Sequence, residues 1–136
     1  RERPKWGRNV RIVRVGALDP RSRDARDRDV KKVVGGFLVQ DRDLLLEDPA
    51  QWKVVSRRRP TEAELASAAF AWSVCKHLKS NAIALARGQS LVGAGAGQMS
   101  RVDSVEIACR KAGARAHGAA LASDAFFPFP DGVEAA

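Results

Sequence analysis

The chain reads Lys79-Ser80-Asn81-Ala82-Ile83 and, after a turn, Gly93-Ala94-Gly95-Ala96-Gly97-Gln98-Met99-Ser100-Arg101-Val102-Asp103-Ser104. The first stretch is a polar pair at the start of a predicted strand. The second is a glycine-rich turn that runs into a predicted helix, with Arg101 in its first turn. Backbone N–H groups, a helix N-terminus and a guanidinium can together bind an anion. The pattern therefore predicts an anion site, and a plain strand-to-helix turn is the alternative.

The surrounding residues predict regular elements in alternation. Apolar residues indicate strands over 81–87 and 91–94, joined by a turn at 89–90. The spacing predicts a helix from Ser100 to Ala112, stopped by Gly113. Its core side chains are expected at four positions, namely Val102, Val105, Ile107 and Cys109. A short inner strand over 119–122, an aromatic-proline loop over 126–130 and a helix from Asp131 complete the pattern.

An earlier helix has a clear start signal. Thr61 precedes Glu64 by three residues, which is the spacing of a capping box. Apolar residues at helical spacing predict a helix that runs to about Lys79. Strands are also expected over 10–15, 33–40 and 53–56, with close backbone approach at the Gly-Gly pair of the second. Strands alternating with helices predict an α/β layered domain.

Length and composition describe a globular chain. Its 136 residues, 45% hydrophobic and 29% charged, predict one domain with a sizeable core. No apolar run is long enough to cross a bilayer, so no membrane association is expected. Cys75 and Cys109 lack zinc-site spacing, so we expect two buried thiols, no metal and a cytoplasmic location.

The net charge of +8 is concentrated at one end of the chain. Residues 1–32 carry +7 and the remainder carries +1. Basic segments often contact nucleic acid. Here acidic residues alternate with arginines over 21–29 and Trp6 is the one aromatic, so a solvated loop is the preferred interpretation. Contact with a polyanion is the alternative.

Two side chains in the opening stretches are candidates for chemistry. The Asn81 carboxamide could hold a carbonyl or an amine between reacting groups, or it could cap the preceding helix. Arg101 sits where the helix dipole favours anions, so it needs a partner. That partner is either an anionic ligand or Asp103.

The aromatic loop offers a further candidate surface. Phe126, Phe127 and Phe129 lie within four residues and must be covered by protein or by a flat ligand. The carboxylate of Asp131 could accept two parallel hydrogen bonds from a pterin. Lys76 and His77 diverge by about 100° on a helix, so we expect a solvated helix face there instead of an acid–base pair.

Five blocks of the sequence resemble one enzyme family. They are residues 36–43, 59–65, 79–83, 95–104 and 123–129, and the last two are long and distinctive. Together they resemble the bifunctional AICAR formyltransferase/IMP cyclohydrolase of purine biosynthesis, in its C-terminal transformylase region. The resemblance covers residues 33–136 and is weaker over 1–32. It implies a cytidine-deaminase-like α/β domain, incomplete at both ends.

The resemblance also implies substrates and site residues. The family transfers a formyl group from 10-formyltetrahydrofolate to the amine of AICAR, without a metal and as a homodimer. It implies that Asn81 is catalytic and lies beside that amine. Arg101 and Phe126 would also contact AICAR, and Val102 and Asp131 would contact the folate.

The chain also departs from the family pattern. The family's catalytic Lys-His block has no match in these residues, so we expect the isolated chain to be inactive in formyl transfer. Pro130 stands where the family usually has Arg, next to the expected folate ligand Asp131. The alternatives are a non-catalytic module that binds nucleotide or RNA through residues 1–32, and a dimerisation module.

Overall fold

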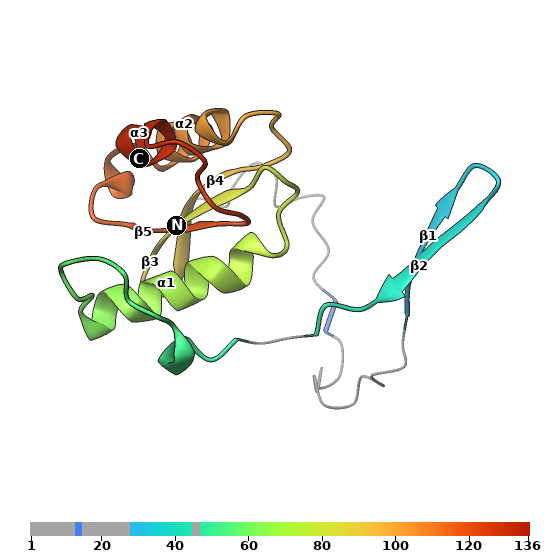
Figure 1. Ribbon diagram of the computed structural model, residues 1–136, viewed down its shortest axis with the longest axis horizontal. Coiled ribbons are helices and arrows are strands. Elements are labelled where there is room, and N and C mark those ends of the chain that lie inside the picture. Colours follow the sequence, from blue (N-terminus) through green and yellow to red (C-terminus); the bar gives the residue numbers. More distant parts are fainter. Residues whose placement is uncertain (1–12, 15–27, 45–46) are drawn as a thin grey trace. The chain divides into compact units, whose positions relative to one another are not determined.

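The computed structural model describes residues 13–14, 28–44 and 47–136 (Figure 1). The chain divides into two compact units, residues 1–45 and residues 46–136. Most of the strand expected over 10–15 lies outside the described residues.

The first unit contains a β-hairpin. Strand β1 (Arg28–Val33) pairs with β2 (Gly36–Asp41) in antiparallel register, and Val33 faces Gly36 across a two-residue loop. Gly35 in that loop has a φ of +84°, a conformation that glycine adopts without steric cost. The prediction of one continuous strand over 33–40 is therefore wrong, because the chain reverses direction at the Gly-Gly pair.

Both strands of the hairpin are exposed along their whole length. Apolar side chains on the hairpin are also exposed. Phe37 is 66% exposed and Val39 is 58% exposed. A two-stranded hairpin in water is only marginally stable. Arg28 forms an ion pair with Asp41 across the open end of the hairpin.

The second unit is built on a three-stranded sheet in the order β4-β3-β5. Strands β3 (Ile83–Arg87), β4 (Ser90–Gly95) and β5 (Ala120–Ser123) confirm the three strands expected in this region. The central strand β3 runs antiparallel to both neighbours. Strand β5 was expected to be an inner strand, but it is an edge strand among the described residues.

Helices cover both faces of this sheet, which gives a three-layer α/β unit (Figure 1). Helix α1 (Glu62–Cys75) packs on one face, and α2 (Arg101–Ala112) packs on the other beside α3 (Asp131–Ala135). Side chains of a strand alternate between its faces. Alanines at 82, 84 and 86 accordingly pack in the core cluster with α1, and the larger Ile83 and Leu85 pack with α2.

Helix α1 begins at the predicted capping box. The Thr61 hydroxyl accepts a hydrogen bond from the Glu64 N–H, and the Glu64 carboxylate accepts one from the Thr61 N–H. Hydrogen bonds from Arg58 and from the Thr61 backbone lower the pKa of Glu64 to about 2. The helix ends at Cys75, four residues before the expected end. Trp72 in this helix is 38% exposed and packs edge-on against Trp52.

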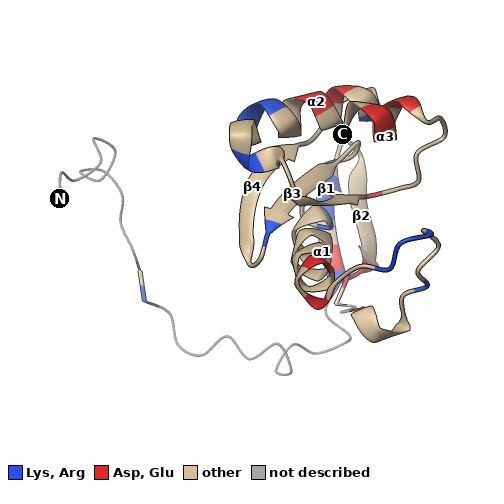
Figure 2. Ribbon diagram, turned by 90° about the vertical axis from the view of Figure 1, so that its left-hand side faces the viewer, with Lys and Arg blue, Asp and Glu red and all other residues tan. Residues whose placement is uncertain are grey.

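Helix α2 has the predicted bounds but a different buried face. Ser100 caps its start, and Gly113, with a φ of +58°, ends it. Ser104, Val105, Ala108 and Ala112 are its buried residues, so only Val105 of the four expected core positions is fully buried. Acidic residues lie at the start of α1 and basic residues at the end of α2, as the helix dipole favours (Figure 2).

Two glycines let strand β4 lie directly against α2. A Cβ atom on Gly93 would lie 2.2 Å from the carbonyl oxygen of Ala108, and one on Gly95 would lie 1.9 Å from that of Ser104. Both distances are far below van der Waals contact, so only glycine fits at either position. The alternation of glycine and alanine in this stretch therefore serves strand–helix packing.

The remaining connections are short. Two 3₁₀ helices, η3 (Pro49–Gln51) and η4 (Gly113–Ala116), lie before α1 and after α2. The strand expected over 53–56 is absent, since these described residues have no strand partner. In the part of the chain that the structure describes, no helix is long and apolar enough to cross a membrane.

Candidate functional site

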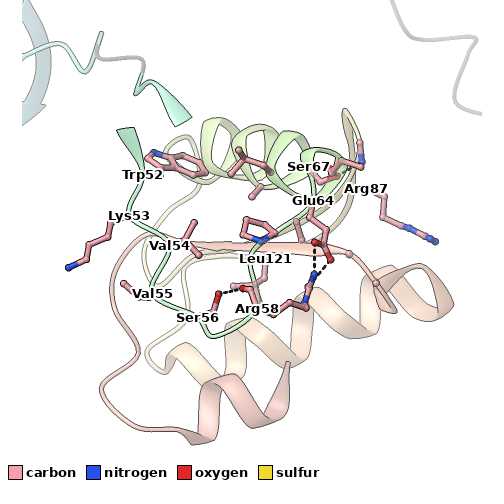
Figure 3. Close-up of a pocket in the computed structure, with 18 residues that line it drawn as sticks. Trp52, Lys53, Val54, Val55, Ser56, Arg58, Glu64, Ser67, Arg87 and Leu121 are labelled. Carbon is pink, nitrogen blue, oxygen red and sulfur yellow. Dashed lines mark hydrogen bonds and ion pairs between the residues drawn. The ribbon is translucent and has the colours of Figure 1, made fainter. Parts of the chain in front are cut away.

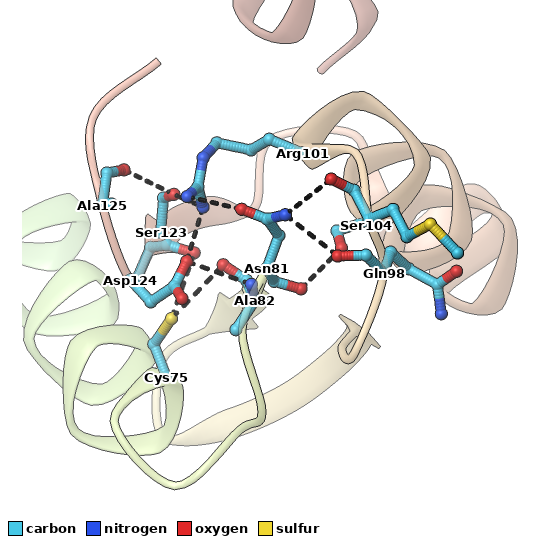
Figure 4. Close-up of polar contacts among 11 residues, drawn as sticks. Cys75, Asn81, Ala82, Gln98, Arg101, Ser104, Ser123, Asp124 and Ala125 are labelled. Atoms are coloured by element: carbon cyan, nitrogen blue, oxygen red, sulfur yellow. Dashed lines mark hydrogen bonds and ion pairs between the residues drawn. The ribbon is translucent and has the colours of Figure 1, made fainter. Parts of the chain in front are cut away.

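The start of β3 meets the ends of β4 and β5 at one end of the sheet. Ile83 pairs with Gly95 of β4 and with Ser123 of β5. Because β3 runs antiparallel to both, the residues before β3 lie beside the residues that follow β4 and β5. Asn81, Arg101 and Asp124 therefore come together, although they are distant in sequence (Figure 4).

The Asn81 side chain is half-buried and held in one orientation. Its Nδ2 donates to the carbonyl oxygens of Gln98 and Met99, at 2.9 and 3.0 Å, and its Oδ1 accepts from Arg101 Nη2 at 2.8 Å. The reversed amide would place Oδ1 against two carbonyl oxygens, so the network assigns the orientation. Both N–H donors are used, and one lone pair of Oδ1 remains to accept a further hydrogen bond.

Backbone contacts hold the segment that carries Asn81. The Ser80–Asn81 peptide bond is cis. The Asn81 N–H donates to the Gln98 carbonyl at 3.1 Å, and the Gly97 N–H donates to the Lys79 carbonyl at 2.6 Å. The alternative role of Asn81 as a helix cap is wrong, because Lys76 occupies the C-cap of α1.

Arg101 lies in the first turn of α2 with only 12% of its side chain exposed. Its Nη1 donates to Ser123 Oγ at 2.9 Å and forms an ion pair with Asp124, while Nη2 donates to Asn81. The expected anionic partner is thus present, but it is Asp124 and not Asp103. Three of the five guanidinium N–H donors are engaged by these described residues, and the others could donate to a ligand oxygen.

Asp124 follows the end of β5 and its side chain is 20% exposed. Its Oδ1 accepts from the Ala82 N–H at 3.0 Å as well as from Arg101. Partial burial opposes ionisation, but hydrogen bonds from Ser80, Ala82 and Arg101 outweigh it and lower the pKa of Asp124 to about 2. The carboxylate therefore stays charged at neutral pH and offsets the charge of Arg101.

A buried serine ties α2 to the same network. Ser104 is fully buried, and its Oγ donates to the Asn81 carbonyl oxygen at 2.7 Å. Ser104 was not predicted from the sequence, and no role was expected for Ser123 or Asp124. No local signal pointed to Ser104, because it is not among the four core positions expected on this helix.

The glycine-rich stretch supports this site without forming the expected anion cradle. Gly93 and Gly95 face the α2 backbone, as described above. Gly97 has a φ of +70°, with open space where a Cβ would be, and its N–H is used by the Lys79 carbonyl. These glycines position the chain that leads to Arg101 in the first turn of α2.

The aromatic loop divides between core and surface. Phe127 packs into the α2 side of the core and touches the space above Gly132. Phe126 and Phe129 are 79% and 67% exposed. The loop thus presents two phenylalanine rings on the surface, immediately after Asp124 in the chain.

The two predicted folate ligands lie on neighbouring helices. Val102 is half-buried in the first turn of α2, and Asp131 is the exposed first residue of α3. These helices pack against each other. Asp131 Oδ1 accepts a hydrogen bond from the Gly132 N–H at 2.7 Å. The second carboxylate oxygen takes no part in this bond.

Lys76 and His77 lie in a turn and not on a helix face as expected, because α1 ends at Cys75. His77 is exposed. The side-chain hydrogen bonds of Asn81 described above go to other residues, namely Gln98, Met99 and Arg101.

Both cysteines lie in helices, but only one of the two thiols expected to be buried is fully buried. Cys75 is 1% exposed, and its Sγ lies 3.7 Å from the carbonyl oxygens of Ala82 and Ala122. Burial, with the nearby charge of Asp124, raises the pKa of this thiol to about 11. Cys109 is half-buried. The described residues contain no group of three or more His, Cys, Asp or Glu that could hold a metal ion.

A pocket of about 940 Å³ opens at the other end of the sheet (Figure 3). It lies between residues 52–60, the first half of α1 and the start of β5, and Arg58 and Glu64 form an ion pair in its wall. Arg87, the last residue of β3, also lines it. None of the residues predicted to bind substrate or folate lines this pocket, so the pocket is separate from the Asn81 site.

Comparison with known families identifies the chain. The family described as the AICARFT/IMPCHase bienzyme matches residues 4–111. The chain belongs to the AICARFT/IMPCHase bienzyme family. The matched stretch includes Asn81 and Arg101, and it also includes most of the basic N-terminal residues.

Individual relatives extend the similarity across almost the whole chain. The bifunctional purine biosynthesis protein PurH of Rhodopirellula baltica is 49% identical over 98% of the chain. PurH of Nostoc punctiforme is 51% identical over 94%, and PurH of Synechocystis is 57% identical over 79%. The chain spans about a quarter of the length of these relatives. Membership of this AICARFT/IMPCHase family supports a role in purine biosynthesis.

Proposed function

We propose that residues 46–136 form part of an AICAR formyltransferase site that uses 10-formyltetrahydrofolate as the formyl donor. The observation that carries the proposal is the hydrogen bond from Arg101 Nη2 to Asn81 Oδ1, which joins two of the three predicted AICAR contacts in one network. Family membership supports this function over the alternative of a nucleic-acid-binding module.

The reaction requires a group that orients the AICAR amine. The amine nitrogen attacks the formyl carbon, a new C–N bond forms, and the bond from that carbon to N10 of the folate breaks. The amine loses a proton and N10 gains one. Asn81 Oδ1, with its remaining lone pair, can accept a hydrogen bond from the amine and direct its nitrogen lone pair at the formyl carbon.

The other residues would hold the rest of the two substrates. The remaining N–H donors of Arg101 would contact AICAR oxygen atoms, and the exposed ring of Phe126 would stack on its heterocycle. Val102 and the carboxylate of Asp131 would contact the pterin of the folate. In this proposal the protein acts as a cytoplasmic homodimer, with further site residues supplied from outside the present 136.

Calorimetric titration of the purified chain with AICAR tests the proposal. Arg101→Lys should weaken binding at least about tenfold, because a lysine ammonium cannot reach Asp124, Asn81 and a ligand together. Arg110→Lys is the matched control, since Arg110 is exposed in the last turn of the same helix, and it should leave the affinity unchanged.

Deletion of residues 1–32 separates the two functional alternatives. The formyltransferase proposal expects AICAR affinity to survive the deletion. Absence of AICAR binding by the intact chain, together with salt-dependent RNA binding that the deletion removes, would overturn the proposal in favour of a polyanion-binding module.

A further inference from the structure

A carboxylate that no substrate contact requires lies at the centre of the polar network. Asp124 accepts hydrogen bonds from the Ala82 N–H and from Arg101 Nη1 (Figure 4). The Ser80 side chain also forms a hydrogen bond with this carboxylate. The Asp124 N–H in turn donates to the Ala82 carbonyl at 3.2 Å. Asp124 therefore bonds to both the N–H and the carbonyl of Ala82, the residue that follows Asn81.

The position of Arg101 depends on this carboxylate for electrostatic reasons. A guanidinium that is 12% exposed, in the first turn of a helix, faces both desolvation and the positive end of the helix dipole. Among the described residues, Asp124 is its ion-pair partner, and the neutral Ser123 hydroxyl is its second Nη1 acceptor. Ser123 and Asp124, at the end of β5, therefore fix the direction in which the Arg101 guanidinium points.

Arg101 in turn determines which atoms of Asn81 are available. Its Nη2 occupies one side of Asn81 Oδ1, while the Gln98 and Met99 carbonyls occupy both N–H groups of Nδ2. A chain of charge-assisted bonds thus runs from carboxylate to guanidinium to carboxamide. The groups of this chain that remain for a ligand are one lone pair of Asn81 Oδ1 and the remaining N–H donors of Arg101.

We infer that Asp124 is a positioning residue of the proposed AICAR site: it holds the Arg101 guanidinium in place and, through it, the side-chain amide of Asn81. This inference rests on the proposed function for its substrate, and on the hydrogen bonds described above for its geometry. Asp124 itself touches neither substrate nor the reacting atoms.

Two measurements on the purified chain test it, with Asp124→Asn and Asp124→Ala as variants. The first is ¹⁵N NMR of the Arg101 side chain, where a held guanidinium shows slow rotation and separate Nη signals. We expect both variants to average these signals while the backbone spectrum stays folded. The second is AICAR affinity, which should fall about tenfold in Asp124→Asn and further in Asp124→Ala.

A matched control variant tests whether the two effects are specific to Asp124. Asp103→Asn removes a carboxylate from the first turn of the same helix and should change neither measurement. If Asp124→Ala does not fold, Ser123→Ala keeps the carboxylate and should retain slow Arg101 rotation, and Asp124→Asn then decides the inference.

The possible results separate this inference from the proposed function. Separate Arg101 Nη signals in folded Asp124→Asn, or an AICAR affinity within twofold of the wild type, would overturn the positioning role. If the wild-type chain does not bind AICAR, the proposed function fails, and release of Arg101 in Asp124→Asn would still establish that Asp124 holds the guanidinium.

Discussion

Arg101 donates from Nη2 to Asn81 Oδ1 at 2.8 Å, across 20 residues of sequence. One residue precedes a central strand and the other opens a helix, and the antiparallel sheet brings them together. The contact uses the one acceptor atom of the Asn81 amide, whose two donors are held by backbone carbonyls. In the proposed AICAR site, the pair would offer a ligand the remaining donors of Arg101 and an acceptor lone pair of Asn81.

Asn81→Asp should destabilise the second unit. The substitution replaces two N–H donors with a carboxylate oxygen that faces the Gln98 and Met99 carbonyls. Leaving these contacts unmade costs about 1–3 kcal/mol of unfolding free energy. Urea denaturation followed by circular dichroism measures the loss at pH 7.

The matched control for that experiment is Gln89→Glu. It makes the same change of amide to carboxylate in the exposed turn between β3 and β4. Its effect should stay within about 0.5 kcal/mol. Equal destabilisation by the two variants would contradict the donor role assigned to Asn81 Nδ2.

Gly95→Ala should destabilise the unit by about 2–3 kcal/mol or more, because a methyl group there overlaps the α2 backbone. The added Cβ would lie 1.9 Å from the Ser104 carbonyl oxygen. Since Ser104 also donates to Asn81, displacement of α2 should weaken AICAR binding too. Thermal denaturation and calorimetry report the two effects. Gly36→Ala, where nothing lies within 4 Å, should leave the transition of residues 46–136 unchanged.

The ionisation of Asp124 makes stability depend on pH in acid. Its pKa is lowered from 3.8 to about 2 in the folded chain. The stabilisation is therefore fully present above about pH 4 and is lost as the pH falls toward 2. Asp124→Asn should show a smaller decrease in unfolding free energy over this interval than the wild type.

Glu64 provides an internal comparison for the same titration. Hydrogen bonds from Arg58 and Thr61 also lower its pKa to about 2, so Glu64→Gln should likewise flatten the pH profile. Glu64 lies at the other end of the sheet, so this variant should leave Arg101 side-chain NMR signals unchanged. A wild-type stability that is constant from pH 4 to pH 2 would contradict both assignments.

Cys75 should resist alkylation in the folded chain. Its thiol is 1% exposed and its pKa is raised to about 11, so little thiolate is present at pH 8. Iodoacetamide should modify it at least about tenfold more slowly in buffer than in 8 M urea. Peptide mass spectrometry distinguishes it from half-buried Cys109, and rapid native modification of Cys75 would show that the α1 face of the core opens readily.

Much of the second unit could be predicted from local pattern. The capping box placed the start of α1, and Ser100 and Gly113 placed both ends of α2. These signals work because a cap satisfies backbone groups within a few residues of itself. The end of α1 was harder, since Lys76 to Lys79 have ordinary helix-forming composition and no glycine stop.

Predictions from the sequence were wrong for residues whose neighbours belong to a different strand or helix. The Gly-Gly pair at 35 and 36 looked like an interruption within a strand, but the partner strand lies just before it in the chain. The glycines at 93 and 95 looked like a ligand cradle, but their neighbour is the backbone of α2. Glycine permits both a turn and a close approach, so its presence does not say which one occurs.

The sequence by itself determined the family and the helix starts, and it proposed Asn81 and Arg101 as site residues, because those signals lie within short stretches of chain. Only the tertiary structure decided their partners. The antiparallel pairing of β3 with β4 and β5 brings Asp124, Ser123 and Ser104 to Asn81 and Arg101. A hydrogen bond between distant residues depends on how the sheet is ordered, and that order is set by packing of both helical layers against it.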